Sequence, residues 1–218
     1  MHLKPKTRLF CTLIFLLLSP TLFSEGKPVG PFSSNGLVGW QSKSFLNLTD
    51  YRLVQDQTTR VLQAQSNGQA SVLIYQQRID LHETPWLNWR WKIKQALNTE
   101  GETTKSGDDY VARIYVVIDG GVLRWKSKAL NYVWSSRSGD IANWPNAYMP
   151  KNAMMMAIRN GMDETETWYD EKRNVLTDLK QIFGKDIRYI DAIAVMTDTD
   201  DTQQSATAWY GDIFFSEQ

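Results

Sequence analysis

Strict alternation of apolar and polar residues over positions 88–94 is the feature that most limits how this chain can fold. Trp89, Trp91 and Ile93 fall on one face of an extended segment, and the asparagine and basic residues between them fall on the other. This period of two predicts a half-buried β-strand. It also predicts that both tryptophans belong to the core, where large aromatic side chains dominate packing.

Comparable segments recur along most of the chain, with turn residues between them. The segment over 109–119 is the most strand-like, and its second face carries Arg113 and Tyr115 among valines, which is typical of a strand covered on both sides. Asn67-Gly68 is a strong hairpin signal. About nine strands are expected, over 51–54, 60–65, 70–76, 88–94, 109–119, 130–135, 153–159, 190–197 and 207–215.

One segment follows a different period. The segment over 168–183 is expected to be helical, because its apolar residues recur at helical spacing and Gly184 stands where a helix would be capped. We therefore expect a mainly β fold, a two-sheet antiparallel sandwich with one inserted amphipathic helix. The proline- and glycine-rich stretch 25–39 predicts a lead-in, and residues 40–218 then form a single domain.

The first 24 residues have the order of a signal peptide. Lys4, Lys6 and Arg8 precede an apolar run over 9–18, and Ser24 offers a small residue for cleavage. The run is too short for a bilayer span of about 20 residues, so we expect no stable transmembrane anchor. The sequence thus predicts a periplasmic or secreted protein.

Charge and composition exclude several classes of function. The 24 basic residues balance the 24 acidic ones, so no basic excess exists for nucleic acid. Two histidines and one cysteine leave too few ligands for a His- or Cys-based zinc site. After cleavage no thiol would remain, and His82 would be the single histidine, which leaves at most one base for a Ser-His-Asp arrangement.

Several long motifs carry a family resemblance. They are LNWRWK at 87–92, GDDYVARIYVV at 107–117, ALNYVW at 129–134, AIAVMTDTD at 192–200 and AWYGDI at 208–213. The chain resembles an exported bacterial family, the domain of unknown function numbered 3047, over nearly all of residues 25–218. That resemblance implies no activity, because the family has none assigned. The final segment WYGDIFF at 209–215 also resembles the last strand of galactose-binding-like jelly rolls, which implies a jelly-roll form of the sandwich.

Polar residues inside apolar strands are the first candidates for a binding site. A sandwich can present such positions on one concave face, and arginine and asparagine supply fixed donors suited to carboxylates or sugar hydroxyls. A buried ion-pair network, with Arg113 paired to Asp109 or Asp198, is the equally weighted alternative. The candidate ligand-binding residues of this kind are Arg90, Arg113, Tyr115, Asn131 and Arg159.

Aromatic residues supply further candidates, because nine tryptophans are present and indole faces stack on sugar rings. Trp134 and Trp144 are expected near strand ends or loops, where they could contact a ligand. The loop over 143–148 is the best candidate, since it combines Trp144 and Tyr148 with side-chain amides such as that of Asn146.

Asp198, Asp200 and Asp201 follow an expected strand and offer oxygen ligands of the kind that Ca²⁺ prefers. The spacing is not that of an EF-hand, and the alternative is that these residues build turns. Ca²⁺ is therefore a candidate, and no other cofactor is expected.

These observations favour a non-catalytic binding module for a glycan or another envelope component. The alternatives are a polysaccharide lyase or hydrolase, with Tyr115 or an aspartate as base and Arg113 holding a substrate carboxylate, and an envelope protein-interaction domain.

Overall fold

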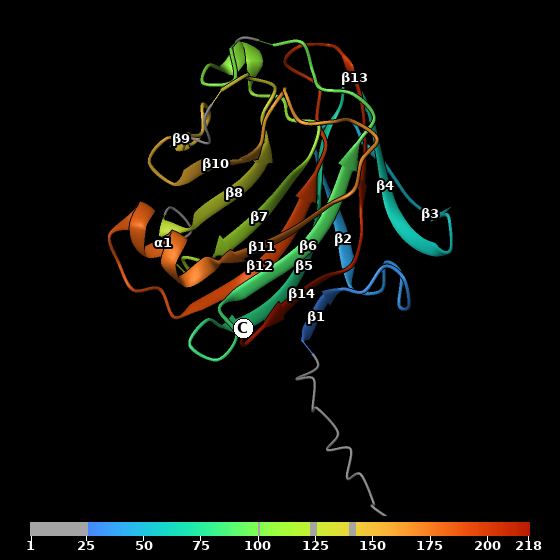
Figure 1. Ribbon diagram of the computed structural model, residues 1–218. Helices are drawn as coiled ribbons and strands as arrows, with labels where there is room; N and C mark the ends of the chain where they lie inside the picture. Colours follow the sequence, from blue (N-terminus) through green and yellow to red (C-terminus); the bar gives the residue numbers. More distant parts are fainter. Residues whose placement is uncertain (1–25, 100, 123–125, 140–142) are drawn as a thin grey trace, which may run out of the picture.

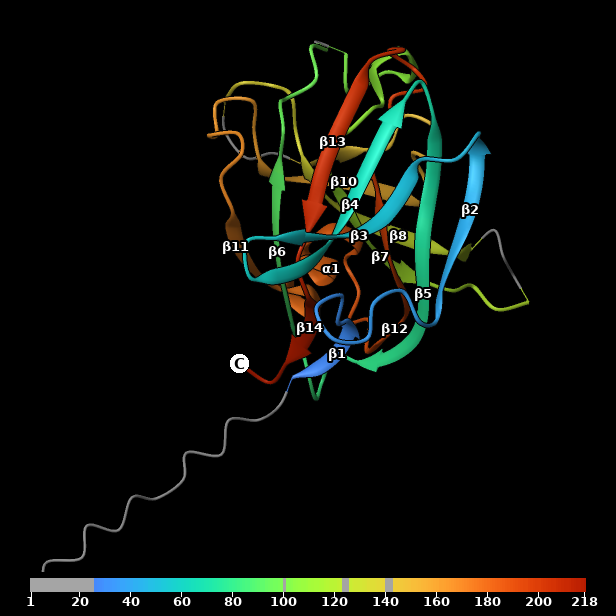
Figure 2. The ribbon, with the colours of Figure 1, turned by 90° about the vertical axis from the view of Figure 1, so that its right-hand side faces the viewer.

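The computed structural model describes residues 26–99, 101–122, 126–139 and 143–218. The predicted signal peptide therefore lies outside the described residues. Within them the chain forms a β-sandwich, with two sheets packed face to face (Figures 1 and 2). No described helix is long and apolar enough to cross a membrane.

One sheet, here called the β6 sheet, has the strand order β1-β14-β6-β13-β4-β3, and β11 also pairs with β6. Its strands are β1 (Lys27–Gly30), β3 (Asp50–Asp56), β4 (Thr59–Asn67), β6 (Trp86–Ile93), β11 (Tyr169–Asn174), β13 (Ser205–Tyr210) and β14 (Ile213–Ser216). The pairs within this sheet are antiparallel.

The other sheet, here called the β7 sheet, has the order β2-β5-β12-β7-β8-β10-β9. Its strands are β2 (Trp40–Leu46), β5 (Ala70–Asp80), β7 (Arg113–Ile118), β8 (Lys128–Trp134), β9 (Asn143–Pro145), β10 (Ala153–Arg159) and β12 (Tyr189–Met196). The pair β8–β10 is parallel, so this sheet is mixed and the expectation of a wholly antiparallel sandwich is corrected at this point.

Aromatic side chains join the two sheets. Trp89 from β6 stacks on Tyr132 from β8 with ring centroids 5.4 Å apart, and Trp91 lies 5.9 Å from Trp134. All four side chains are buried. The expectation that Trp89 and Trp91 form the core is confirmed, because the alternating face of β6 is the face that packs on β8.

The helix is shorter than expected. α1 (Val175–Phe183) begins after Asn174, whose side chain accepts the Thr177 N–H, and ends at Gly184 in a left-handed conformation. Residues 169–174, which were expected to be helical, form strand β11 and pair with β6. Helical spacing holds only from Val175 onward, since the preceding residues alternate between half-buried and exposed positions.

The described residues contain fourteen strands rather than about nine. Five are additional: β1, β2, β9 and β11 were not expected, and the final segment divides into β13 and β14. β9 has only three residues and most of β2 is exposed, so neither carries an apolar period. β1 lies in the expected lead-in, where it pairs with β14, so sheet structure begins before Trp40.

Candidate functional site

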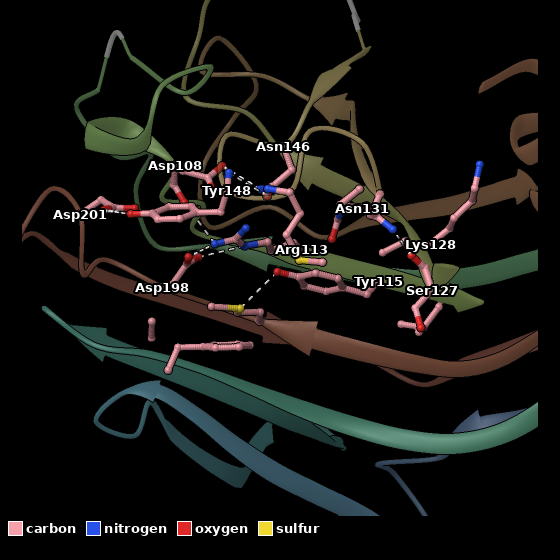
Figure 3. A pocket seen from close by; sticks show the side chains of 18 of the residues that line it. Asp108, Arg113, Tyr115, Ser127, Lys128, Asn131, Asn146, Tyr148, Asp198 and Asp201 are labelled. Atoms are coloured by element: carbon pink, nitrogen blue, oxygen red, sulfur yellow. Dashed lines mark hydrogen bonds and ion pairs between the residues drawn. The ribbon is translucent and has the colours of Figure 1, made fainter. Parts of the chain in front are cut away.

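A cavity of about 500 Å³ lies against the β7 sheet on the face turned away from the sandwich core. Alternation along β7 explains its position: Ile114 and Val116 are fully buried in the core, so Arg113, Tyr115 and Val117 point to the other side. We call this hollow the β7–β8 cavity. Figure 3 shows its wall, with Arg113 and Tyr115 side by side.

Neighbouring strands and loops complete the cavity. Asn131 comes from β8, directly opposite Tyr115 in the strand register. The loops after β9 and β12 add polar groups at one end, and Phe45 from the edge strand β2 adds an aromatic ring. Small or flexible apolar residues cover much of the wall, namely Ala70, Ala129, Ala153, Met149 and Met196.

Arg113 is held in a buried ion pair. The residue is 2% exposed, and its guanidinium binds both carboxylate oxygens of Asp198, with Nε 3.0 Å from Oδ1. Nη2 also donates to the Asp108 carbonyl oxygen at 3.2 Å. A buried charge needs such partners, so the pairing between Arg113 and Asp198 considered from the sequence is present. The guanidinium nevertheless lines the cavity.

Asn131 has an unused acceptor on the cavity wall. The residue is 1% exposed, and its Nδ2 donates to the Met154 carbonyl oxygen at 3.1 Å. Its Oδ1 is buried and has no hydrogen-bond partner among the described residues. Buried amide oxygens are rarely left unpaired, because losing water without gaining a partner costs about 1–3 kcal/mol. A ligand donor is one way to satisfy this oxygen.

Aspartates gather at the end of the cavity formed by the loops. Asn146 Nδ2 donates to both carboxylate oxygens of Asp108, at 3.2 and 2.9 Å. Tyr148 donates its hydroxyl to Asp201 at 2.6 Å. Burial raises the pKa of the Asp108 carboxyl, with Arg113 and Asn146 acting in the opposite direction.

Asp200 lines the same end of the cavity. The pKa of its carboxyl is also raised, first by burial and then by the negative charges of Asp201 and Asp109. Several carboxyl groups therefore lie close together at this end of the cavity. Their ionised forms are disfavoured unless a positively charged group lies nearby.

Three carboxylates lie close enough together to share a metal ion, but they are not the three expected. Oxygens of Asp109, Asp198 and Asp200 lie within 4.8 Å of one another, whereas Asp201 turns to Tyr148. Asp198 is already paired with Arg113, and Asp109 accepts the backbone N–H groups of residues 201 and 202. Two of the three carboxylates are thus satisfied without a cation, and Ca²⁺ binding stays a prediction.

Four of the predicted site residues lie away from the cavity. Arg90 is on the β6 sheet, in a second hollow of about 470 Å³, with its guanidinium 4.3 Å from the centre of the Trp168 ring. Arg159 pairs with Glu171, Nε to Oε1 at 2.6 Å. Trp134 is fully buried and donates its Nε1–H to the Asn160 carbonyl oxygen.

Trp144 is the fourth of these residues. It is 7% exposed and stacks on Tyr110, to whose hydroxyl it donates at 3.2 Å. The loop prediction over 143–148 nevertheless identified two residues of the cavity, Asn146 and Tyr148. Phe45 and Met149 were not predicted as ligand contacts, and no local pattern distinguishes them from ordinary loop and edge residues.

Fold and site together define a class: a jelly-roll sandwich with a polar and aromatic cavity on the outer face of one sheet. The protein belongs to the family described as "Protein of unknown function (DUF3047)", whose model matches residues 38–214. This confirms the family resemblance drawn from the sequence motifs. No curated protein sequence matches the chain.

Solved structures with a similar fold include modules and enzymes of polysaccharide degradation. A family 30 carbohydrate-binding module of a Clostridium thermocellum cellulosomal cellulase is 12% identical, covering 83% of this chain and 92% of its own, with a TM-score of 0.49. A family 11 module of the same organism, in complex with a mixed-linked tetrasaccharide, is 12% identical, covering 84% and 92%, with a TM-score of 0.42.

Endoglucanase cel12A from Rhodothermus marinus is 10% identical, covering 81% of this chain and 95% of its own, with a TM-score of 0.46. At these identities the likeness concerns the fold alone. The strand pairing of this chain itself confirms the sandwich expected from the sequence. Function has to be argued from the cavity.

Proposed function

We propose that the protein is a non-catalytic binding module that takes a glycan or another envelope component in the β7–β8 cavity. The unpaired Oδ1 of Asn131 carries this proposal, since it is a buried acceptor with no partner among the described residues and belongs to a side chain that lines the cavity. Sugars present many hydroxyl donors, and one such hydroxyl would satisfy this oxygen.

The rest of the wall supports the same class of ligand. Its volume of about 500 Å³ lies within the range of roughly 300–1,000 Å³ that is common for ligand pockets. Tyr115 and Tyr148 provide aromatic faces, and apolar side chains lie between the polar groups. Sugar rings have the matching character, with C–H faces that pack on aromatic rings and hydroxyls at their edges.

The geometry favours binding over the lyase alternative. Tyr115 donates its hydroxyl to the Met196 sulfur at 3.3 Å, and burial raises the pKa of that hydroxyl. A tyrosine held in this way is a poor general base near neutral pH. Arg113, the group expected to hold a substrate carboxylate, is already paired with Asp198.

A comparison of two alanine variants tests the proposal. The purified protein is screened on a glycan array, and affinities for the glycans it retains are measured by calorimetry for Asn131→Ala and Arg90→Ala. We expect Asn131→Ala to weaken binding about tenfold or more, because a hydrogen bond to a buried group is lost. Arg90→Ala alters the other sheet and should leave the affinity unchanged.

Other outcomes point elsewhere. Absence of binding to every glycan would favour the protein-interaction alternative, and release of reducing ends or unsaturated sugars during incubation would favour an enzyme. If only Arg90→Ala loses binding, the glycan binds to the β6 sheet and not in the β7–β8 cavity. Thermal unfolding of each variant shows whether it is folded.

We also propose that the protein is exported to the periplasm or beyond, as the basic and apolar character of residues 1–18 suggests. Cell fractionation followed by mass spectrometry tests this proposal. Cleavage after Ser24 would leave a chain that begins at Glu25. Recovery of the uncleaved chain from the cytoplasm would contradict it.

A further inference from the structure

Hydrogen-bond donors around the β7–β8 cavity are largely committed to partners within the protein. Asn146 Nδ2 donates to Asp108, and the Tyr148 hydroxyl donates to Asp201. Asn131 Nδ2 and the Tyr115 hydroxyl also have internal acceptors, a carbonyl oxygen and a thioether sulfur. A ligand therefore meets few free donors on this wall.

Acceptors are in excess on the same wall. Asn131 Oδ1 has no partner among the described residues. No described side chain donates a hydrogen bond to the Asp200 carboxylate, which also lines the cavity. The carboxylates of Asp108 and Asp201 each receive donors from a single neighbouring side chain, which leaves acceptor capacity on their oxygens.

The charged side chains of the cavity are unbalanced as well, with more acidic than basic groups. Four aspartates line the cavity, against two cationic side chains, Arg113 and Lys128. Arg113 is neutralised by Asp198. Lys128 lies at the opposite end of the cavity from Asp201 (Figure 3), with its Nζ 4.3 Å from the centre of the Phe183 ring. Lys105 also lies near the end formed by the loops, with its Nζ 5.1 Å from the centre of the Tyr148 ring, so acidic side chains still outnumber basic ones at this end.

We infer that the ligand of this cavity is an amine-bearing glycan, whose ammonium group lies at the aspartate end and whose hydroxyl or N–H groups reach Asn131. This inference rests on the proposed function and specifies the chemistry of the ligand. An ammonium group only donates hydrogen bonds and carries a positive charge. It therefore complements both the free acceptors and the negative charge of the aspartates. A uronate presents the opposite charge and would be repelled.

Four oligosaccharides of equal length test the inference by calorimetry at low ionic strength. They are oligomers of glucosamine, N-acetylglucosamine, glucose and galacturonic acid. We expect the glucosamine oligomer to bind about tenfold more tightly than either neutral oligomer, and we expect no measurable binding of the galacturonate. Added salt should reduce the preference for the amine, because a charge interaction is screened.

A matched pair of variants locates the preference. Asp200→Asn should remove the advantage of the glucosamine oligomer over the glucose oligomer. Asp186→Asn is the control, since Asp186 precedes β12 whereas the aspartate end follows that strand, and its side chain is 57% exposed beside His82. That substitution should leave both affinities unchanged.

The possible failures are distinguishable. Equal binding of amine-bearing and neutral oligomers, or tighter binding of the galacturonate, would overturn the inference and leave the proposed function standing. Binding that keeps its amine preference in Asp200→Asn would also overturn it. Failure of all four oligomers to bind, together with an empty glycan array, would remove the proposed function as well.

Discussion

Arg113 is a buried charged residue, and its burial requires an ionic partner. Both Arg113 and Asp198 have side chains only 3% exposed, so each depends on the other to offset the loss of water. Their ion pair joins the first residue of β7 to the loop after β12, at the aspartate end of the cavity. The same pair therefore shapes the cavity and stabilises the fold.

Removing Arg113 should be costly for stability. We expect Arg113→Ala to lower the free energy of unfolding by about 3–5 kcal/mol, because Asp198 is left as a buried and unpaired charge. Urea denaturation measures this change. Arg52→Ala serves as control, since Arg52 pairs with Asp50 at the surface and its loss should cost less than about 1 kcal/mol. If Arg113→Ala keeps full stability and loses only glycan binding, Arg113 is a ligand contact and the ion pair is dispensable.

At the scale of elements, α1 links the two sheets. Val175 and Leu179 are buried in the main core, and the helix contacts β6 of one sheet. Asp178 accepts a hydrogen bond from the Tyr132 hydroxyl of β8 at 2.8 Å and pairs with Arg173 of β11. The helix thus closes one side of the sandwich through packing and through one polar cluster.

The start of the helix depends on its cap. The Asn174 side chain accepts the Thr177 N–H at 3.0 Å, so Asn174→Ala should destabilise the protein by about 1 kcal/mol. Asn174→Asp keeps an acceptor at this position and should retain most of the stability. Chemical denaturation of the two variants checks this difference. Equal losses in both would show that the cap hydrogen bond does not stabilise the helix.

At the scale of the whole molecule, the segment before Trp40 completes the sandwich. β1 pairs with β14 near the end of the chain, and Phe32 is fully buried, with its ring 5.4 Å from that of Trp40. Arg60 of β4 donates to the Phe32 carbonyl oxygen at 3.0 Å. The two ends of the described chain therefore stabilise each other.

Two substitutions in this segment should have very different effects on the free energy of unfolding. Phe32→Ala should cost about 3–5 kcal/mol, because it opens a cavity in the core. Val38→Ala should change stability by less than about 0.5 kcal/mol, since Val38 is 67% exposed. Thermal and urea unfolding measure both effects. A small effect of Phe32→Ala would mean that this segment is a dispensable lead-in, as its composition suggests.

Residue alternation was enough to predict the class of fold and the inward faces of β6 and β7. Period-two alternation is a local property, so it placed Trp89 and Trp91 in the core and Arg113 and Tyr115 on the opposite face of their strand. It failed for β11, whose charged residues carry no apolar period, and for β9, which is too short to show one.

Which outward-facing residues share a site depends on strand pairing and could not be predicted from alternation. Arg90 and Arg113 both lie on the face of their strand that is turned away from the core, yet they lie on different sheets. Trp134 is buried because residues distant in sequence, Tyr169 and Asn160, cover the end of its strand. Alternation fixes the face of a residue within its strand, whereas strand pairing and loop packing are long-range and determine which residues surround the cavity.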